Sequence, residues 1–278
     1  MIPAAGIGTR LLSVTKEMPK EMLPLFTKNF NGEICLKPIV QIVYEQLFRT
    51  GFREFCFIVG RGKRVIEDHF LPDYQYLERL KANGRKEAAN DLMEFYKKIE
   101  SSTLIWINQT EPKGFGDAVL QAKSFTNEEP FLVHAGDTYI SSNGEKYLHQ
   151  IIKTSKTKDV ASTLCLLPVD NTKHYGVAEI SGKKSPYIIK RVIEKPKNPP
   201  TNLAIMPVYM FTNKIYDALE NIGLGQGGEI QLTDGIQKLI DENQKVVAFK
   251  LTRSLHLDIG TPKTYWNAQK ISYNNLTK

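Results

Sequence analysis

Hydrophobic residues along the chain fall into short apolar runs that alternate with amphipathic segments. The runs have the length of β-strands, and the longer segments repeat their hydrophobic positions with the period of an α-helix. The expected strands are residues 2–4, 54–59, 103–107, 131–135, 160–167, 176–180, 188–193, 204–211 and 246–251. The expected helices are residues 39–50, 65–70, 75–82, 86–99, 115–124, 146–155, 214–221, 231–242 and 262–273. This alternation predicts an α/β fold with a mostly parallel sheet and helices on both faces.

The chain shows no sign of division into separate domains. It has 278 residues, no internal repeat and no low-complexity tract, and its Pro- and Gly-rich stretches are too short to be linkers. We therefore expect a single domain over residues 1–278. Residues 71–102 contain two amphipathic segments around Asn83-Gly84, which predicts a helical hairpin inserted between two strands.

Composition excludes several classes of protein. With 41% hydrophobic and 24% charged residues the chain can bury a core, so it is neither disordered nor fibrous. No apolar run is long enough for a membrane helix, and residues 1–6 lack the features of an export signal. Cys35, Cys56 and Cys165 are far apart and odd in number, which favours free thiols. We expect a soluble, cytoplasmic protein that does not bind a membrane.

The chain is basic, with a net charge of +7 and a pI near 9.1. This charge would suit a polyanionic partner or a small anionic substrate such as a nucleotide. The basic residues are interspersed with acidic ones, apart from a local excess at 183–197, and no basic motif with interleaved aromatic residues is present. We therefore expect no nucleic-acid partner.

A glycine loop directly follows the first expected strand. Gly6 and Gly8 would let the backbone approach a phosphate, and the planar guanidinium of Arg10 can bind phosphate oxygens. Leu11 stands where a dinucleotide fingerprint needs a third glycine, and the loop lacks the ending of a Walker motif. An ordinary strand-to-helix turn could contain the same glycines.

Two further charged residues are candidates for phosphate chemistry. Lys20 lies between Pro19 and Pro24, which restrict the backbone around it, although a solvated lysine would be the commoner case. Asp137 follows the apolar run 131–136, so its carboxylate should emerge at the carboxyl end of a strand, where ligands of such sheets bind. An oxygen ligand there suits Mg²⁺, although aspartate after glycine is also common in turns.

A longer series of motifs extends from the glycine loop almost to the other end of the chain. Its members are residues 4–10, 19–24, 37–38, 114–118, 136–137, 175–177, 192–196, 202–204, 229–234 and 258–260. In this order they resemble the sugar-1-phosphate nucleotidylyltransferase family, which implies its Rossmann-like nucleotide-diphospho-sugar transferase fold. Residues 20–24, the insert and residues 202–204 are most similar to the bacterial and archaeal uridylyltransferases that join UTP and glucose 1-phosphate.

The resemblance implies a reaction and its participants. The phosphate of glucose 1-phosphate would attack the α-phosphorus of UTP in line, giving UDP-glucose and pyrophosphate with Mg²⁺ as cofactor and no covalent enzyme intermediate. Joining two polyanions requires arginine, lysine and a divalent cation to neutralise charge. Relatives of this type are usually dimers or tetramers, so a homo-oligomer is expected.

The resemblance also assigns roles to residues. The catalytic group comprises Arg10, Lys20, Asp137 and Lys195. The nucleotide would be bound by Ala4, Ala5, Gly6, Gly8, Thr9, Arg10, Gln109 and Gly114, with the last two contacting the base. The sugar phosphate would be bound by Tyr175, Gly176, Glu194, Lys195, Asn202 and Glu229. The metal would be held by Asp137 and Asp258.

Two departures from the family pattern are visible. Residues 27–36 lengthen the connection before Lys37-Pro38, and we expect a loop there that could reshape access to the site. Asp117 stands where close relatives often carry histidine, beside the expected base-binding residues.

Three alternatives stay open at the level of the sequence. Thymine and uracil present the same hydrogen-bonding edge to Gln109, so an enzyme that uses dTTP, or both UTP and dTTP, would fit equally well. Non-catalytic regulatory subunits share the fold. They commonly lose the charged groups, whereas Arg10, Lys20, Asp137 and Lys195 are all present here.

Overall fold

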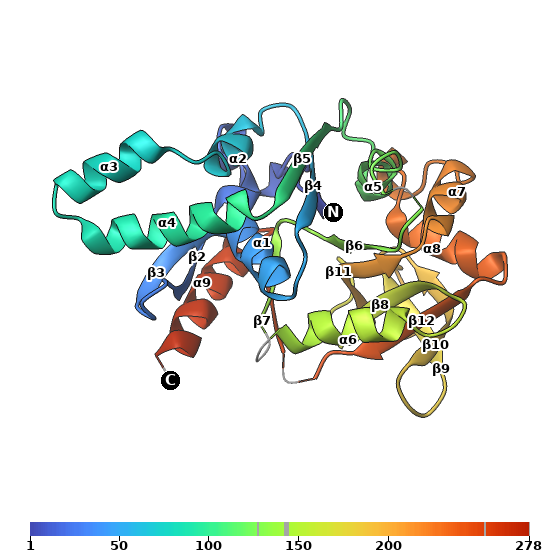
Figure 1. Ribbon diagram of the computed structural model, residues 1–278. Coiled ribbons are helices and arrows are strands. Elements are labelled where there is room, and N and C mark those ends of the chain that lie inside the picture. Colours follow the sequence, from blue (N-terminus) through green and yellow to red (C-terminus); the bar gives the residue numbers. More distant parts are fainter. Residues whose placement is uncertain (127, 142–144, 253, 278) are drawn as a thin grey trace.

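Strands and helices alternate along the chain in the computed structural model, which describes residues 1–126, 128–141, 145–252 and 254–277 (Figure 1). The strands are β1 (Ile2–Pro3), β2 (Pro24–Lys28), β3 (Ile34–Pro38), β4 (Glu54–Val59), β5 (Thr103–Asn108), β6 (Phe131–His134), β7 (Thr138–Ser141), β8 (Val160–Pro168), β9 (Val177–Ser181), β10 (Tyr187–Ile193), β11 (Leu203–Phe211), β12 (Lys245–Lys250) and β13 (Leu255–Asp258). The helices are α1 (Ile39–Arg49), α2 (Arg64–His69), α3 (Tyr74–Ala82), α4 (Lys86–Glu100), α5 (Phe115–Leu120), α6 (Lys146–Ser155), α7 (Lys214–Glu220), α8 (Leu232–Asp241) and α9 (Pro262–Leu276). Every strand and helix expected from the hydrophobic pattern is present, although several ends differ by a few residues.

The central strands form a mostly parallel sheet. β1 pairs in parallel with β4, and β4 with β5. On its other side β1 runs parallel to β6, because the His134 amide donates to the Met1 carbonyl at 3.1 Å and the Gly136 amide to the Pro3 carbonyl at 3.0 Å. β6 then continues into the order β6-β11-β8-β12-β10-β9. Only β10 and β11 run against the other strands of this series, so the expected sheet is confirmed.

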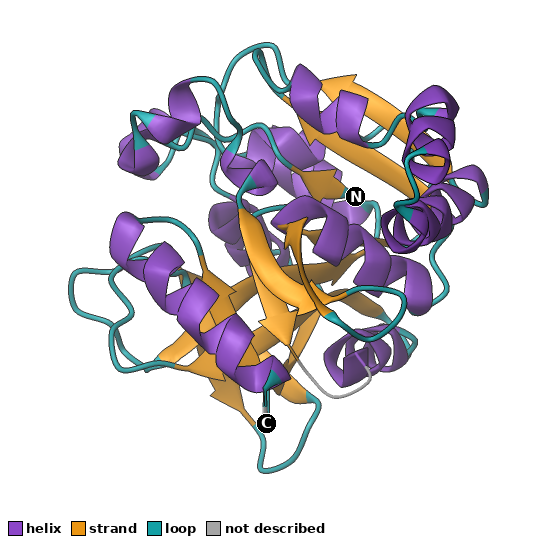
Figure 2. Cartoon of the chain, turned by 90° about the vertical axis from the view of Figure 1, so that its left-hand side faces the viewer, coloured by secondary structure: helices purple, strands orange, loops and turns teal. Residues whose placement is uncertain are grey.

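Helices cover both faces of the sheet, as expected (Figure 2). Along β4, Cys56 and Ile58 pack into a cluster that includes residues of α5, α7 and α8. Phe55 and Phe57 pack into a second cluster with residues of α1, α4 and α6. Since successive side chains of a strand point to opposite faces, the two clusters lie on opposite sides of the sheet.

Helices α3 and α4 occupy the stretch in which the sequence predicts a helical hairpin, and Figure 1 shows them extending away from the sheet. Gly84 in the connection has φ 73°, a conformation that favours glycine. Leu77 of α3 and Phe95 of α4 are buried, whereas most other positions of the two helices are exposed or half-buried.

Two pairs of short strands were not expected from the hydrophobic pattern. β2 and β3 form an antiparallel hairpin, so residues 27–36, expected to be a loop, contain the end of β2, the start of β3 and the turn between them. β7 and β13 also pair antiparallel, and their register places Asp258 opposite Thr138. Because Thr138 directly follows Asp137, this pairing brings the backbone of Asp258 close to that of Asp137.

Two expectations from composition can be compared with the structure. None of the described residues forms a helix with the length and apolar character needed to cross a bilayer. The three cysteines are free thiols, as expected, and Cys56 and Cys165 are buried.

Candidate active site

A cavity of about 330 Å³ opens where the carboxyl ends of parallel strands β1, β5 and β6 meet. Polar groups from distant parts of the chain line it together with backbone of the glycine loop. Of the residues predicted for the site, it is lined by Ala5, Gly6, Gly8, Thr9, Lys20, Gln109, Gly114, Asp137 and Glu229. The fold therefore brings together most of the predicted nucleotide-binding residues and two of the predicted catalytic residues.

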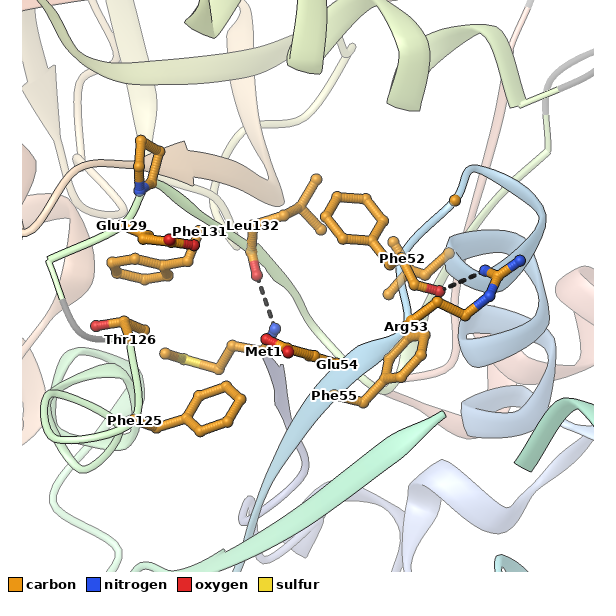
Figure 3. A pocket seen from close by; sticks show the side chains of 13 residues that line it. Met1, Phe52, Arg53, Glu54, Phe55, Phe125, Thr126, Glu129, Phe131 and Leu132 are labelled. Atoms are coloured by element: carbon orange, nitrogen blue, oxygen red, sulfur yellow. Dashed lines mark hydrogen bonds between the residues drawn. The ribbon is translucent and has the colours of Figure 1, made fainter. Parts of the chain in front are cut away.

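A larger cavity, of about 610 Å³, lies at the opposite end of these strands (Figure 3). Glu54 and Phe131, the first residues of β4 and β6, line it together with Met1, whose amino group donates to the Leu132 carbonyl at 2.8 Å. Burial lowers the pKa of this amino group to about 6. Because ligands of such sheets bind beyond the carboxyl ends of strands, and because none of the predicted site residues lies here, we place the site in the smaller cavity.

The glycine loop is held tightly against its neighbours. A Cβ atom on Gly6 would lie 3.4 Å from the Cε and Nζ atoms of Lys20, so the lysine packs directly on the loop backbone. Gly8 has φ 71°, which favours glycine, and its carbonyl accepts a hydrogen bond from the Thr15 hydroxyl at 2.8 Å. The loop is thus fixed in a conformation that exposes its backbone to the cavity.

Lys20 and Asp137 form an ion pair inside the cavity. Burial alone would raise the pKa of Asp137, but the ammonium of Lys20 outweighs it and holds this pKa below its ordinary value. Burial likewise acts to lower the pKa of Lys20, but Asp137 and Glu21 raise it on balance. Both groups are therefore charged at neutral pH, which places a fixed cation and a carboxylate beside the glycine loop.

A second buried ion pair supports the first. Glu21 is 1% exposed and accepts from the Lys63 ammonium at 2.8 Å. Burial raises the pKa of Glu21, although Lys63 and Lys20 act against it. This pair was not predicted from the sequence. The position of Lys63 could have indicated it, because Lys63 follows β4 after a glycine turn, just as Asp137 follows β6.

Arg10 and Asp258 lie on either side of Gly260, outside the cavity. A Cβ atom on Gly260 would lie 3.0 Å from both the Arg10 Nη2 and the Asp258 Oδ1 atom, so the two side chains flank this glycine. Asp258 also accepts from the Gly260 amide at 2.9 Å. Arg10 is exposed and does not line the cavity, in contrast to the rest of the glycine loop.

Four of the six predicted sugar-binding residues lie together near the end of β10: Tyr175, Gly176, Glu194 and Lys195. Glu194 accepts from the Thr233 hydroxyl at 2.6 Å and from the Lys195 ammonium at 2.8 Å. A Cβ atom on Gly176 would lie 2.8 Å from the Thr233 hydroxyl and 3.2 Å from Glu194, so only glycine fits there without displacement. The backbone joins the group as well, because the Lys195 amide donates to the Tyr175 carbonyl at 3.1 Å. Thr233, which the sequence analysis considered only as part of a helix start, is therefore a positioning residue for Glu194.

Three predicted residues lie at the margins of these groups. The Ala4 amide donates to the Ile58 carbonyl at 2.7 Å, so it holds the loop on β4 and does not line the cavity. Glu229 lines the cavity and accepts from Gln231 at 3.2 Å. Asn202 is exposed at the start of β11, where its carbonyl accepts from the Val169 amide at 3.0 Å. Its role in sugar binding stays a prediction.

The predicted base-binding pair lies at the end of β5 and the start of α5. The Gln109 side-chain amide donates to the Gly114 carbonyl at 3.1 Å and to the Asp117 carboxylate at 2.6 Å. Gly114 has φ 109°, and a Cβ atom there would lie 2.7 Å from the Ile230 carbonyl oxygen. Gln109 and Gly114 are thus fixed beside each other in the cavity wall.

The chain is similar to proteins of known activity over almost its whole length. The chain is 37% identical over 268 residues to a UTP–glucose-1-phosphate uridylyltransferase of Streptococcus pneumoniae, covering 94% of this chain and 85% of the relative. It is also 37% identical to the enzyme of the same name from Bacillus subtilis, covering 90% of this chain and 82% of that one. Among solved structures, a UDP-glucose pyrophosphorylase complexed with UDP-glucose matches with a TM-score of 0.82 and 28% identity, covering 99% of this chain and 100% of the other. A family model described as nucleotidyl transferase matches residues 1–274, and the chain therefore belongs to the nucleotidyl transferase family.

Proposed function

We propose that the protein transfers a uridylyl group from UTP to glucose 1-phosphate, giving UDP-glucose and pyrophosphate. The observation that carries this proposal is the Lys20–Asp137 ion pair, which lies in one cavity with the glycine loop and the Gln109–Gly114 pair. Family membership and the activity of the two uridylyltransferases named above point to the same reaction.

In this reaction a phosphate oxygen of the sugar attacks the α-phosphorus of UTP, and the bond from that phosphorus to the pyrophosphate oxygen breaks. Both reactants are anions, so the site must neutralise negative charge in the transition state. Lys20 supplies a half-buried positive charge beside the loop backbone. Arg10, exposed at the end of the loop and outside the cavity, would bind the leaving phosphates with its planar guanidinium.

The sugar phosphate would bind at the Glu194 group. A carboxylate accepts hydrogen bonds from two sugar hydroxyls, and the Lys195 ammonium pairs with a phosphate. The Lys195 side chain is 38% exposed, so its ammonium is accessible to a substrate phosphate, and Glu194 keeps the hydrogen bond from the Thr233 hydroxyl.

The oxygen donors of the site fit Mg²⁺. Asp137 lines the cavity and directly precedes β7, whose first residue, Thr138, pairs with Asp258, so the two carboxylates lie on neighbouring segments although Asp258 is outside the cavity. Within the described ranges, no cluster of three or more His, Cys, Asp and Glu side chains could hold a metal alone. Mg²⁺ is commonly held by one or two carboxylates together with substrate phosphates, which matches this donor set. When bound, Mg²⁺ would neutralise charge on the triphosphate.

We also propose a homo-oligomer, a dimer or tetramer, built in the cytoplasm from one domain per chain with α3 and α4 as an insert. Phe30 and Leu36 of the β2–β3 hairpin and Trp266 and Tyr273 of α9 are exposed. Phe26 and Tyr273 lie with ring centroids 5.1 Å apart, so the hairpin and α9 present neighbouring apolar side chains. Such exposed apolar patches commonly mark protein interfaces. Light scattering of the purified chain measures the oligomeric state.

Release of pyrophosphate tests the proposed function. The purified chain is incubated with Mg²⁺ and glucose 1-phosphate, and UTP, dTTP, CTP, ATP and GTP are offered separately. We expect release with UTP. Release with dTTP as well would identify an enzyme of dual specificity. No release with any nucleotide, from protein shown to be folded, would contradict the proposal and favour a regulatory subunit of the same fold.

A further inference from the structure

We propose that Asp117 fixes the side-chain amide of Gln109 in the orientation that accepts the N3–H of uracil, and thereby excludes cytosine nucleotides. This inference rests on the proposed function for the identity of the substrate. Asp117 would act through Gln109, so it is a positioning residue and does not itself contact the base.

Hydrogen bonding determines which way the Gln109 amide points. Its Nε2 atom lies 2.6 Å from Asp117 Oδ2 and 3.1 Å from the Gly114 carbonyl oxygen. A carboxylate and a carbonyl can only accept hydrogen bonds, so both must face the NH₂ group of the amide. The reverse orientation would place the amide oxygen of Gln109 against two other oxygens.

Gln109 and Asp117 are both buried, and Asp117 is also hydrogen-bonded to Gln121, so a change in the orientation of the Gln109 amide is energetically costly. Gln109 is 5% exposed and Asp117 is 6% exposed. The other carboxylate oxygen of Asp117 accepts from the Gln121 side chain at 3.3 Å, which keeps the carboxylate from rotating away. Leaving a buried donor or acceptor unsatisfied costs about 1–3 kcal/mol.

The fixed orientation leaves the Gln109 oxygen for the ligand. Both hydrogens of the amide are used by Asp117 and Gly114, and Gln109 and Gly114 line the cavity. An oxygen there accepts from the N3–H of uracil. In cytosine the N3 atom is itself an acceptor, so it would repel this oxygen. Thymine has the same N3–H as uracil and should be accepted equally by this contact.

Substitution of Asp117 by asparagine tests the inference with little change of shape. The new amide can either donate to the Gln109 oxygen or accept from its NH₂ group, so residue 117 no longer fixes the Gln109 amide and only the Gly114 carbonyl still favours the original orientation. Binding of UTP, dTTP and CTP to the full chain is measured by titration calorimetry, alongside pyrophosphate release. For D117N we expect the ratio of the CTP and UTP dissociation constants to fall about threefold or more. The dTTP affinity should fall with that of UTP, while the KM for glucose 1-phosphate stays within twofold.

Two controls separate positioning from a general structural role. Asp217→Asn makes the same chemical change at an exposed carboxylate of α7 and should leave the nucleotide preference unchanged. In a Gln109→Ala background, D117N should have no further effect on the CTP to UTP ratio, because the amide that it orients is absent. If D117N does not fold, Gln121→Met, which removes the group that holds Asp117, should still lower the preference about two- to threefold.

The outcomes distinguish this inference from the proposed function. An unchanged CTP to UTP ratio in D117N, or in Gln121→Met if D117N does not fold, would overturn the inference even if the enzyme is active. An equal loss of affinity for UTP, dTTP and CTP would also overturn the inference, because a purely structural role of Asp117 would give that result. If the wild type binds UTP but forms no product, the proposed function fails and the binding ratio still tests Asp117. If the wild type does not bind UTP, both fail.

Discussion

Single residues with a strained or crowded backbone mark the sugar side of the site. Lys195 has φ 38°, which is uncommon for a residue with a side chain, and it directly follows Glu194. Gly176 lies against Glu194 and Thr233 with no room for a Cβ atom. Positions of this kind persist when the surrounding structure fixes them, and they are frequent at functional sites. Strain of this kind could not be predicted from the residue types, because these backbone angles depend on tertiary contacts.

Lys195→Ala tests the assignment of the sugar phosphate. The substitution removes the ammonium that would pair with the phosphate, so we expect the KM for glucose 1-phosphate to rise about tenfold or more while the KM for UTP changes less than twofold. Lys190→Ala, at an exposed position of β10, is the matched control and should behave as wild type. A change confined to the KM for UTP would contradict the role assigned to Lys195.

Secondary structure follows the hydrophobic pattern where an element buries one full face. The helices α1 and α6 and strands β4 and β8 have regular apolar spacing, and their positions are predicted nearly to the residue. The short strands β7 and β13 were missed because each has four residues and gains its stability from pairing with a distant segment. The missed pairing matters for the site, since it brings Asp258 to the neighbourhood of Asp137.

The start of α9 offers a test of how this element is held. The Thr261 hydroxyl accepts from the Thr264 amide at 3.2 Å, and the Thr264 hydroxyl in turn accepts from the Thr261 amide at 2.9 Å. Because Thr261→Ala removes the first of these bonds, we expect the free energy of unfolding to fall by about 1 kcal/mol. Urea denaturation measures this change. Thr277→Ala, at the other end of α9, is the control and should have a smaller effect.

At the scale of the whole molecule, buried histidines make stability depend on pH. His134 is 0% exposed, and burial lowers its pKa from 6.5 to about 4. The unfolded chain binds a proton at this residue below pH 6.5, whereas the folded protein does not until about pH 4. Stability therefore falls between these two values as the pH decreases, by about 2 kcal/mol at pH 5 from this residue.

His134→Gln should remove this contribution. The difference in free energy of unfolding between pH 7 and pH 5, measured with urea, should be about 2 kcal/mol smaller in the variant than in the wild type. His149→Gln, at an exposed position of α6, is the control and should keep the pH dependence of the wild type. An identical pH dependence in His134→Gln would show that His134 is not held neutral by the fold.

The location of several site residues at one edge of the sheet could be predicted, because parallel strands bring their carboxyl ends to the same edge. Asp137 was predicted at this edge because it follows an apolar strand, and Gln109 was predicted from the family resemblance. Both residues line the cavity. The partners that hold them could not be predicted, since the Gln109–Asp117 and Glu194–Thr233 contacts depend on side-chain geometry across elements. Arg10 was placed with the loop, but its side chain lies outside the cavity, against Gly260.

We propose that the Lys20–Asp137 pair forms the centre of a uridylyl transfer site. The decisive measurement is the steady-state rate of UDP-glucose formation from UTP and glucose 1-phosphate with Mg²⁺, in the wild type and in Asp137→Asn. We predict a rate at least a hundredfold lower, about 3 kcal/mol of lost transition-state stabilisation, in a variant whose circular dichroism spectrum is unchanged. A folded Asp137→Asn variant that keeps its rate within threefold of the wild type would contradict the account.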